Sequence, residues 1–156
     1  MDAPPKLTIV PLGTRPDLIP LTVAWHLDAF EPDGDPASWT RVRTEEAALT
    51  GIPCVWIAID DEKPVGMVSL VEDDMDTRRD LSPWLAALLV VPSRRGRGIG
   101  SALVRRCERE AWNAGVDRLY LNTSTAKPLY ERLGWLILGE EDYEGDRVTV
   151  MFREAP

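Results

Sequence analysis

Residues 85–122 change their hydrophobic period twice, and this change restricts the fold more than any other stretch of the chain. Residues 85–91 are continuously apolar, which is typical of a short strand buried on both faces. From Ile99 the apolar residues recur at helical spacing as far as Gly115, where a helix would stop. Residues 118–122 then predict another strand. Strand, loop, helix and strand in this order predict a βαβ unit with parallel strands.

The loop inside this unit is rich in glycine and arginine. The first turn of a helix leaves backbone N–H groups without partners and carries partial positive charge. Glycines let a ligand approach those donors, and arginines supply forked donors suited to phosphate oxygens. A glycine-rich turn with solvated arginines is the alternative. The pattern predicts a polyphosphate site at Arg94, Arg95, Gly96, Arg97, Gly98, Ile99 and Gly100.

The spacing of the glycines excludes two common phosphate loops. The loop has no Gly-Lys-Ser/Thr, so it is not a Walker A loop, and G-x-G-x-G does not match the dinucleotide fingerprint G-x-G-x-x-G. A methyltransferase-type glycine loop is the nearest competitor. Its ligand, S-adenosylmethionine, has no phosphate and would not need three arginines.

Two motifs give the chain a resemblance to the GNAT (GCN5-related) N-acetyltransferase family. Residues 95–100 match that family's Arg/Gln-x-x-Gly-x-Gly/Ala signature at a strand-to-helix turn. Ala126, residues 129–133 (Leu-Tyr-Glu-Arg-Leu) and Gly134-Trp135 match a second family signature further along the chain. The two motifs cover about a third of the chain directly.

The resemblance implies acetyl-CoA as cofactor, with its pyrophosphate held by residues 95–100 and Arg94 within reach of a phosphate oxygen. It also implies that the pantetheine arm pairs with the main chain of Leu89, Val90 and Val91. Many family members have Asn seven residues before the tyrosine of the second motif. Here that position is Thr123, whose hydroxyl is the expected substitute, because Asn122 would point to the other face of a strand.

The reaction that the resemblance implies is acetyl transfer to an amine. It needs a base for the amine, a donor for the thioester oxygen and an acid for the departing thiolate. Tyr130 matches the family's Leu-Tyr position and is the candidate acid. The candidate base is an acid of the loop after residues 65–71, with Glu72 first because it directly follows a strand. The other candidates are Asp73, Asp74, Asp76 and Asp80.

The whole chain predicts a single α/β domain over residues 1–156. We expect a mixed, mostly antiparallel sheet of about seven strands around the central parallel βαβ unit, with helices on both faces. Residues 54–59 and 65–71 predict one antiparallel hairpin, and residues 136–138 and 148–152 a second, with its turn at Glu144-Gly145. Ser38 is a candidate helix cap. The acceptor side falls within about residues 1–80 and the acetyl-CoA core within about 84–135.

The helix after the glycine loop has a predicted outer face of Arg105, Glu108, Arg109 and Asn113. Cys54 and Cys107 fit small core residues rather than nucleophiles, and the single histidine, His26, fits a structural role. With no Cys/His cluster, no metal site is expected.

The charge of −8 is unevenly distributed. Residues 1–80 hold 7 Lys/Arg and 16 Asp/Glu, whereas residues 81–156 hold 11 and 10. An acidic first half disfavours nucleic acid and slightly favours a cationic amine, although a solvated acidic face explains it equally well. No apolar run reaches membrane-spanning length and Met1–Pro5 has no signal pattern, so a cytoplasmic protein without a membrane partner is expected.

Three function classes follow from these features. The first is an acetyl-CoA-dependent N-acetyltransferase that acts on a small-molecule or peptide amine. The second is a non-catalytic acyl-CoA sensor or interaction module, against which the presence of Tyr130 argues. The third is an S-adenosylmethionine-dependent methyltransferase, against which the arginines argue. The identity of the acceptor and the presence of a homodimer stay open.

Overall fold

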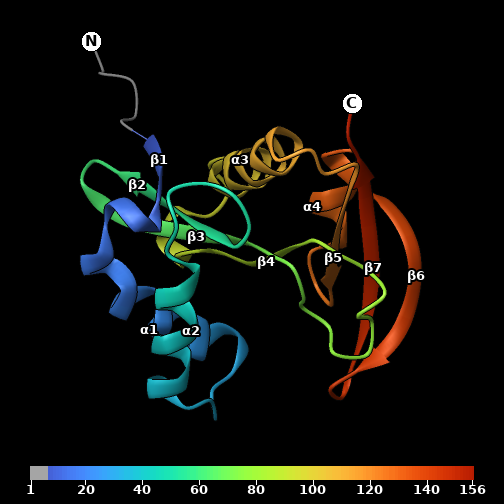
Figure 1. Cartoon of the computed structure of the whole chain (residues 1–156), viewed down its shortest axis with the longest axis horizontal. Helices are drawn as coiled ribbons and strands as arrows, with labels where there is room; N and C mark the ends of the chain where they lie inside the picture. Colours follow the sequence, from blue (N-terminus) through green and yellow to red (C-terminus); the bar gives the residue numbers. More distant parts are fainter. Residues whose placement is uncertain (1–6) are drawn as a thin grey trace.

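A computed structural model describes residues 7–156, so the expectation about Met1–Pro5 lies outside the described residues. Seven strands form one sheet in the order β1-β2-β3-β4-β5-β7-β6 (Figure 1). All neighbouring strands are antiparallel except β4 and β5. The predicted mixed α/β sheet of seven strands is therefore confirmed. The strands are β1 (Leu7–Pro11), β2 (Cys54–Asp60), β3 (Lys63–Val71), β4 (Trp84–Val90), β5 (Arg118–Thr123), β6 (Leu136–Tyr143) and β7 (Asp146–Glu154).

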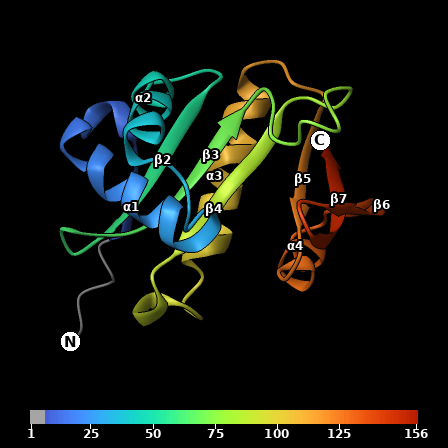
Figure 2. The ribbon, with the colours of Figure 1, turned by 90° about the horizontal axis from the view of Figure 1, so that it is seen from below.

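Helices cover both faces of the sheet, as expected (Figure 2). α1 (Ile19–Phe30) and α2 (Pro36–Glu46) pack together on one face, and α3 (Ile99–Asn113) and α4 (Lys127–Arg132) lie on the other. The side chains of β2 explain why both faces are apolar: Trp56 joins the core on the α3 side, and its neighbours Val55 and Ile57 join the core on the α1 side. Within residues 7–156, no helix is long and apolar enough to cross a lipid bilayer.

Helix α2 begins earlier than the sequence suggested. Asp35, not Ser38, is its N-cap: the Asp35 carboxylate accepts a hydrogen bond of 3.1 Å from the Ser38 backbone N–H. Pro36 occupies the first turn, where a missing N–H removes no helical hydrogen bond. The prediction was wrong because Asp and Ser both cap well, and the proline between them decides the start.

Helix α3 has one inward-facing acid that the pattern placed outside. Arg105, Arg109 and Asn113 are exposed as predicted, but Glu108 is buried. Its carboxylate accepts hydrogen bonds from Arg105 at 2.8 Å and from the indole of Trp135 at 3.0 Å. These hydrogen bonds stabilise the buried carboxylate. The prediction that Glu108 lies on the outer face was wrong, because it rested on the helical period alone.

The prediction that strand β4 is buried on both faces holds only for its beginning. Trp84 and Leu85 are buried, whereas Ala86–Val90 are half-buried. β4 and β5 run parallel and pair at Trp84 and Tyr120, and beyond this pair they diverge (Figure 2). The divergence opens the sheet between its two halves.

Candidate functional site

A cavity of about 640 Å³ occupies the opening between β4 and β5. Its floor is formed by β4 at Leu85–Leu88 and by residues 121–126, which are the end of β5 and the turn that follows it. Its sides come from α1 and α2, from the β3–β4 loop and from the β6–β7 turn. Tyr130 of α4 also lines it. Thr123 and Tyr130 therefore line one cavity with Asp73 and Asp74, whereas Glu72 and the predicted cofactor residues 89–91 and 94–100 are not among its lining residues.

A β-bulge changes the direction of β4 at this floor. Ala86 pairs with Ser69 and Leu89 with Met67, so Ala87 and Leu88 lie opposite Val68 alone. Ala87 has a φ of 52°, a left-handed conformation that is costly for a residue with a side chain. Bulges commonly leave a residue out of the ladder next to active sites. The backbone of Ala87 and Leu88 is thus the part of β4 that can face a ligand in the cavity.

The hydrogen bonds of β4 limit which of the predicted residues Leu89, Val90 and Val91 can offer main-chain groups to a ligand. The Val91 N–H donates to the Val65 carbonyl at 2.9 Å, so it is not free for a ligand. Because alternate residues of an antiparallel strand face the same neighbour, Leu89 also turns to β3, whereas Leu88 and Val90 turn to the open edge. Of the three predicted residues Val90 therefore turns its main-chain groups to that edge, as does the neighbouring Leu88.

The glycine loop joins β4 to α3 as predicted, through a short 3₁₀ turn at Pro92–Arg94. Two of its arginines have protein partners: the Arg94 Nε donates to Asp60 at 3.1 Å, and the Arg95 Nε donates to the Val90 carbonyl at 3.0 Å. Arg97 is exposed. Helix α3 begins at Ile99 without a side-chain hydrogen bond to its first N–H groups. Such groups attract anions, so an anion site at this turn stays a prediction.

The loop glycines have two different roles. Gly96 and Gly98 have φ values of 77° and 81°, so their conformation favours glycine whatever surrounds them. Gly100 has no such restriction, and a Cβ built there would make ordinary contacts of 3.8 Å with Val90 and 4.0 Å with Leu129. The protein tolerates a side chain at Gly100, which leaves ligand approach as the reason for a glycine there.

We predict that Gly98→Ala and Gly100→Ala separate these roles. Gly98→Ala should lower the free energy of unfolding by about 1–2 kcal/mol, because an alanine at this φ is strained. Gly100→Ala should leave thermal stability unchanged or higher and raise the Kd for coenzyme A at least about tenfold. Denaturant unfolding and calorimetry measure the two effects. Equal coenzyme A affinity in Gly100→Ala and wild type would contradict the cofactor role of this turn.

Tyr130, the predicted acid, lines the cavity from α4. It is only 5% exposed, it lines the cavity, and its ring packs edge-on against Trp135. Burial raises the pKa of the Tyr130 hydroxyl, with a smaller contribution from Cys107. The hydroxyl therefore stays protonated at neutral pH and is available to donate a proton.

The β3–β4 loop brings a different acid to the cavity than the one placed first. Asp73 and Asp74 line the cavity. Glu72 is also exposed but does not line it. The Asp74 carboxylate accepts a hydrogen bond of 2.8 Å from the Asn122 side chain, which ties the loop to β5. Burial raises the pKa of Asp74 to about 6 and the charge of Glu144 adds to this rise, while the Asn122 hydrogen bond opposes it.

Asn122 and Thr123 both line the cavity, contrary to the expectation that only one of them faces it. The Thr123 hydroxyl accepts a hydrogen bond of 2.9 Å from the Ala126 N–H, so it closes the turn that leads into α4. Thr123 therefore has a local structural partner, and Asn122 holds Asp74. No sequence signal linked Asn122 to Asp74, because 48 residues separate them.

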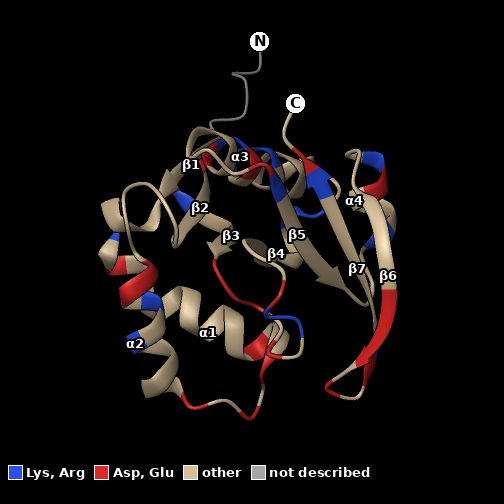
Figure 3. Ribbon diagram, turned by 45° about the vertical axis from the view of Figure 1, so that its right-hand side comes forward, with Lys and Arg blue, Asp and Glu red and all other residues tan. Residues whose placement is uncertain are grey.

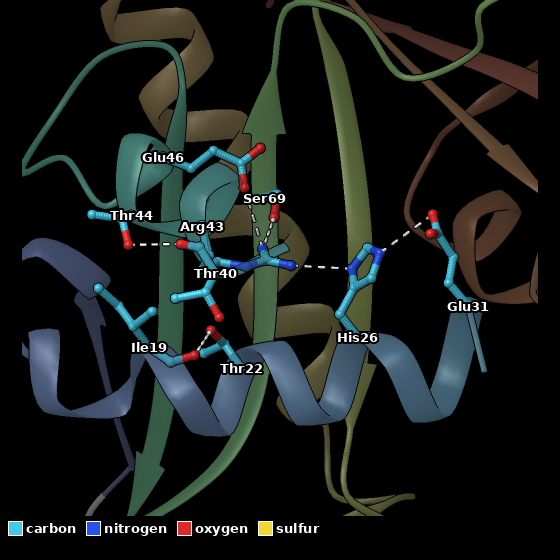
Figure 4. Close-up of polar contacts among 9 residues, drawn as sticks. All are labelled: Ile19, Thr22, His26, Glu31, Thr40, Arg43, Thr44, Glu46 and Ser69. Atoms are coloured by element: carbon cyan, nitrogen blue, oxygen red, sulfur yellow. Dashed lines mark hydrogen bonds and ion pairs between the residues drawn. The ribbon is translucent and has the colours of Figure 1, made fainter. Parts of the chain in front are cut away.

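A buried polar cluster supports the α1–α2 side of the cavity (Figure 4). Arg43 is 1% exposed and donates to the Ser69 hydroxyl at 3.2 Å and to His26 Nδ1 at 3.1 Å. Glu46 lies 3.5 Å from the same guanidinium. Burial and the charge of Arg43 lower the pKa of His26 to about 4, against the opposing effect of Glu31. His26 is thus neutral at pH 7 and holds α1 to α2, in line with its predicted structural role.

Both cysteines are buried in the core next to α3, as expected. Burial raises the pKa of Cys54 to about 11 and that of Cys107 well above its usual value. A thiol with a raised pKa is almost entirely protonated at pH 7 and is a poor nucleophile.

Comparison with known proteins agrees with this geometry. The model of the acetyltransferase (GNAT) family matches residues 20–135, which include α1, the βαβ unit and Tyr130. The chain belongs to the GNAT acetyltransferase family. Human N-acetyltransferase 8B is 36% identical over 117 residues, which cover 65% of this chain and 52% of that protein. The chain spans about half the length of the curated relatives that it matches.

Solved structures show that the fold is that of the same family. A GNAT-family acetyltransferase from Streptococcus pneumoniae superposes with a TM-score of 0.72 at 19% identity, covering 97% of this chain and 100% of that one. An aminoglycoside 6'-N-acetyltransferase complexed with coenzyme A superposes with a TM-score of 0.73 at 21% identity, covering 94% and 96%. The family uses acetyl-CoA, which is the cofactor that the resemblance implied.

Proposed function

We propose that this GNAT domain transfers the acetyl group of acetyl-CoA to a primary amine by direct attack within the cavity between β4 and β5. The single observation that carries the proposal is the opening of the sheet beyond the Trp84–Tyr120 pair: ionisable side chains line its cavity, and β4, which forms part of its floor, leads into the glycine loop. Residues 7–156 would act as one unit, in which α1, α2 and the β3–β4 loop form the acceptor side.

The binding of acetyl-CoA would follow the open edge of β4. The pyrophosphate would contact the N–H groups at the start of α3 and the guanidinium groups of residues 94–97. The pantetheine arm would pair with the backbone of Leu88 and Val90. This path places the thioester at the bulge, where a backbone N–H of Ala87 or Leu88 can stabilise the oxygen that becomes negative in the transition state.

Asp74 is the proposed general base and Tyr130 the proposed general acid. With a pKa of about 6, Asp74 is mostly ionised at pH 7 and can take a proton from the ammonium, directly or through one water. The neutral amine attacks the thioester carbon, the bond to sulfur breaks, and the nitrogen loses its second proton through water to the phenolate that Tyr130 becomes when it protonates the thiolate. Tyr130 donates its proton to the departing thiolate. The two groups differ in pKa because a carboxyl is a much stronger acid than a phenol, and burial raises the pKa of both without reversing that order.

Two measurements test the proposal against its alternatives. Coenzyme A at 100 times its Kd should stabilise the fold by about 2.7 kcal/mol and raise Tm by about 5–10 °C, with no effect from S-adenosylmethionine. Thiol release from acetyl-CoA should then increase when a primary amine is added. Stabilisation by coenzyme A without amine-dependent thiol release would favour the acyl-CoA sensor instead. A shift with S-adenosylmethionine alone would support the methyltransferase.

A further inference from the structure

The two sides of the acceptor cavity differ in chemistry. The α1–α2 side presents three large apolar side chains, Phe30, Trp39 and Val42, together with the carboxylates of Glu31 and Glu46. Phe30 is 46% exposed and Val42 38% exposed, so apolar surface lies open at the cavity instead of in the core. The Trp39 ring lies 3.8 Å from the His26 ring, centre to centre, and its indole N–H donates to Glu31 at 2.9 Å, so its position is fixed. We call Phe30, Trp39 and Val42 the apolar wall.

The other side presents carboxylates. Asp73 and Asp74 come from the β3–β4 loop, and Glu144 and Asp146 come from the β6–β7 turn. Figure 3 shows acidic segments along this loop and along the end of the β6–β7 hairpin. The ion pair of 2.8 Å between Arg78 and Glu141 and the Asn122–Asp74 hydrogen bond hold the loop beside β5 and β6. We call Asp73, Asp74, Glu144 and Asp146 the acidic wall.

The remaining ionisable residues of the cavity offer no free positive charge to a ligand. Arg43 is the only Lys or Arg among the lining residues within 7–156, and Glu46, Ser69 and His26 surround it. A guanidinium can only donate, so His26 Nδ1 accepts and the proton of the neutral ring lies on Nε2. His26 is 8% exposed, and this Nε2 has no hydrogen-bond partner; the nearest carboxylate, Glu31, is 3.7 Å away.

We propose that the acceptor is a small primary amine whose single ammonium group is attached to an aromatic or branched apolar body. This assignment rests on the proposed function. The ammonium would lie at the acidic wall beside Asp74, and the body would cover the apolar wall. Burial of the apolar body against Phe30 and Trp39 and attraction of the ammonium to the carboxylates would both favour binding. A polycation fits less well, because a second ammonium would lose hydration wherever it met the apolar wall instead of Glu31.

A series of amines tests this assignment: ethylamine, butylamine, 1,4-diaminobutane and 2-phenylethylamine. From ethylamine to 2-phenylethylamine kcat/KM should rise at least about tenfold, because each apolar group that enters a pocket adds binding. The kcat/KM for butylamine should exceed that for 1,4-diaminobutane, which has the same carbon chain with a second ammonium group. A reversed order for that pair would overturn the assignment, as would a peptide N-terminus acetylated faster than 2-phenylethylamine.

Variants of Phe30 show whether the apolar wall is responsible. Phe30→Ala should lower kcat/KM for 2-phenylethylamine about tenfold more than kcat/KM for ethylamine, while Phe30→Leu should restore most of this difference. Leu136→Ala is the matched control, because Leu136 is 59% exposed on β6 and does not line the cavity. An equal loss for all amines in Phe30→Ala would assign Phe30 a structural role and overturn the proposal.

Direct binding separates a failure of this inference from a failure of the proposed function. Calorimetry on the protein saturated with coenzyme A should show tighter binding of 2-phenylethylamine than of ethylamine or 1,4-diaminobutane. Selective binding without any thiol release from acetyl-CoA would refute the transferase and leave the ligand class standing. Absence of selective binding would refute the ligand class, whatever the rate of acetyl transfer.

Discussion

Asp74→Asn should lower kcat about 10²–10⁴-fold, because an amide cannot accept the proton that the attacking amine must lose. The wild-type kcat/KM should rise with pH through an apparent pKa of about 6, the value to which burial raises the Asp74 carboxyl. The sign follows from the base role, since only the ionised carboxylate accepts a proton and it forms above this pKa. Rate measurements between pH 5 and 8 should show this rise in wild type and its loss in the variant.

The folded state should tolerate Asp74→Asn. A carboxyl whose pKa is raised on folding binds protons more tightly in the folded chain, so its contribution to stability falls as pH rises from about 4 to 6. Removing the charge at pH 7 should therefore not lower the free energy of unfolding. Glu72→Gln is the matched comparison, because Glu72 is exposed and lies outside the cavity lining. A larger rate loss in Glu72→Gln than in Asp74→Asn would contradict the assignment of the base.

Tyr130→Phe should lower kcat about 10²-fold at unchanged Kd for acetyl-CoA, because the departing thiolate loses its proton donor. Phenylalanine preserves the edge-on contact with Trp135 and the burial against the core, so Tm should stay within about 2 °C of wild type. Stopped-flow thiol release and equilibrium binding of acetyl-CoA measure the two quantities separately. A variant with full kcat would reduce Tyr130 to a packing residue of α4.

The parts of the fold that follow local patterns could be predicted from the sequence. The change of period around the glycine loop defined β4, α3 and β5, and the turn at Glu144-Gly145 defined the second hairpin. Gly115 and Gly134 end helices with positive φ, as their positions suggested. These features depend on neighbours within a few residues. The spacing of apolar side chains indicates the type of element, and a glycine that can adopt a positive φ indicates where a helix ends.

The features that depend on distant contacts could not be predicted. Glu108 faces inward because Trp135 reaches it from the loop after α4, 27 residues later. β4 is half-buried because it diverges from β5, which no property of its own apolar residues reveals. Glu72 was placed first for its position after a strand, but the loop turns so that Asp74 meets Asn122. Pairing across the sheet determines which acid faces the cavity.

The central claim is that acetyl-CoA and the amine occupy one cavity together and react without a covalent enzyme intermediate. Initial rates of thiol release, measured over a range of acetyl-CoA concentrations at several fixed amine concentrations, test it most directly. Because both cysteines are buried with raised pKa values, neither is suited to carry the acetyl group. We therefore expect that both substrates bind in the opening between β4 and β5, and that the double-reciprocal lines intersect, as a ternary complex requires. Parallel lines, the result for an acetylated enzyme that releases coenzyme A before the amine binds, would contradict it.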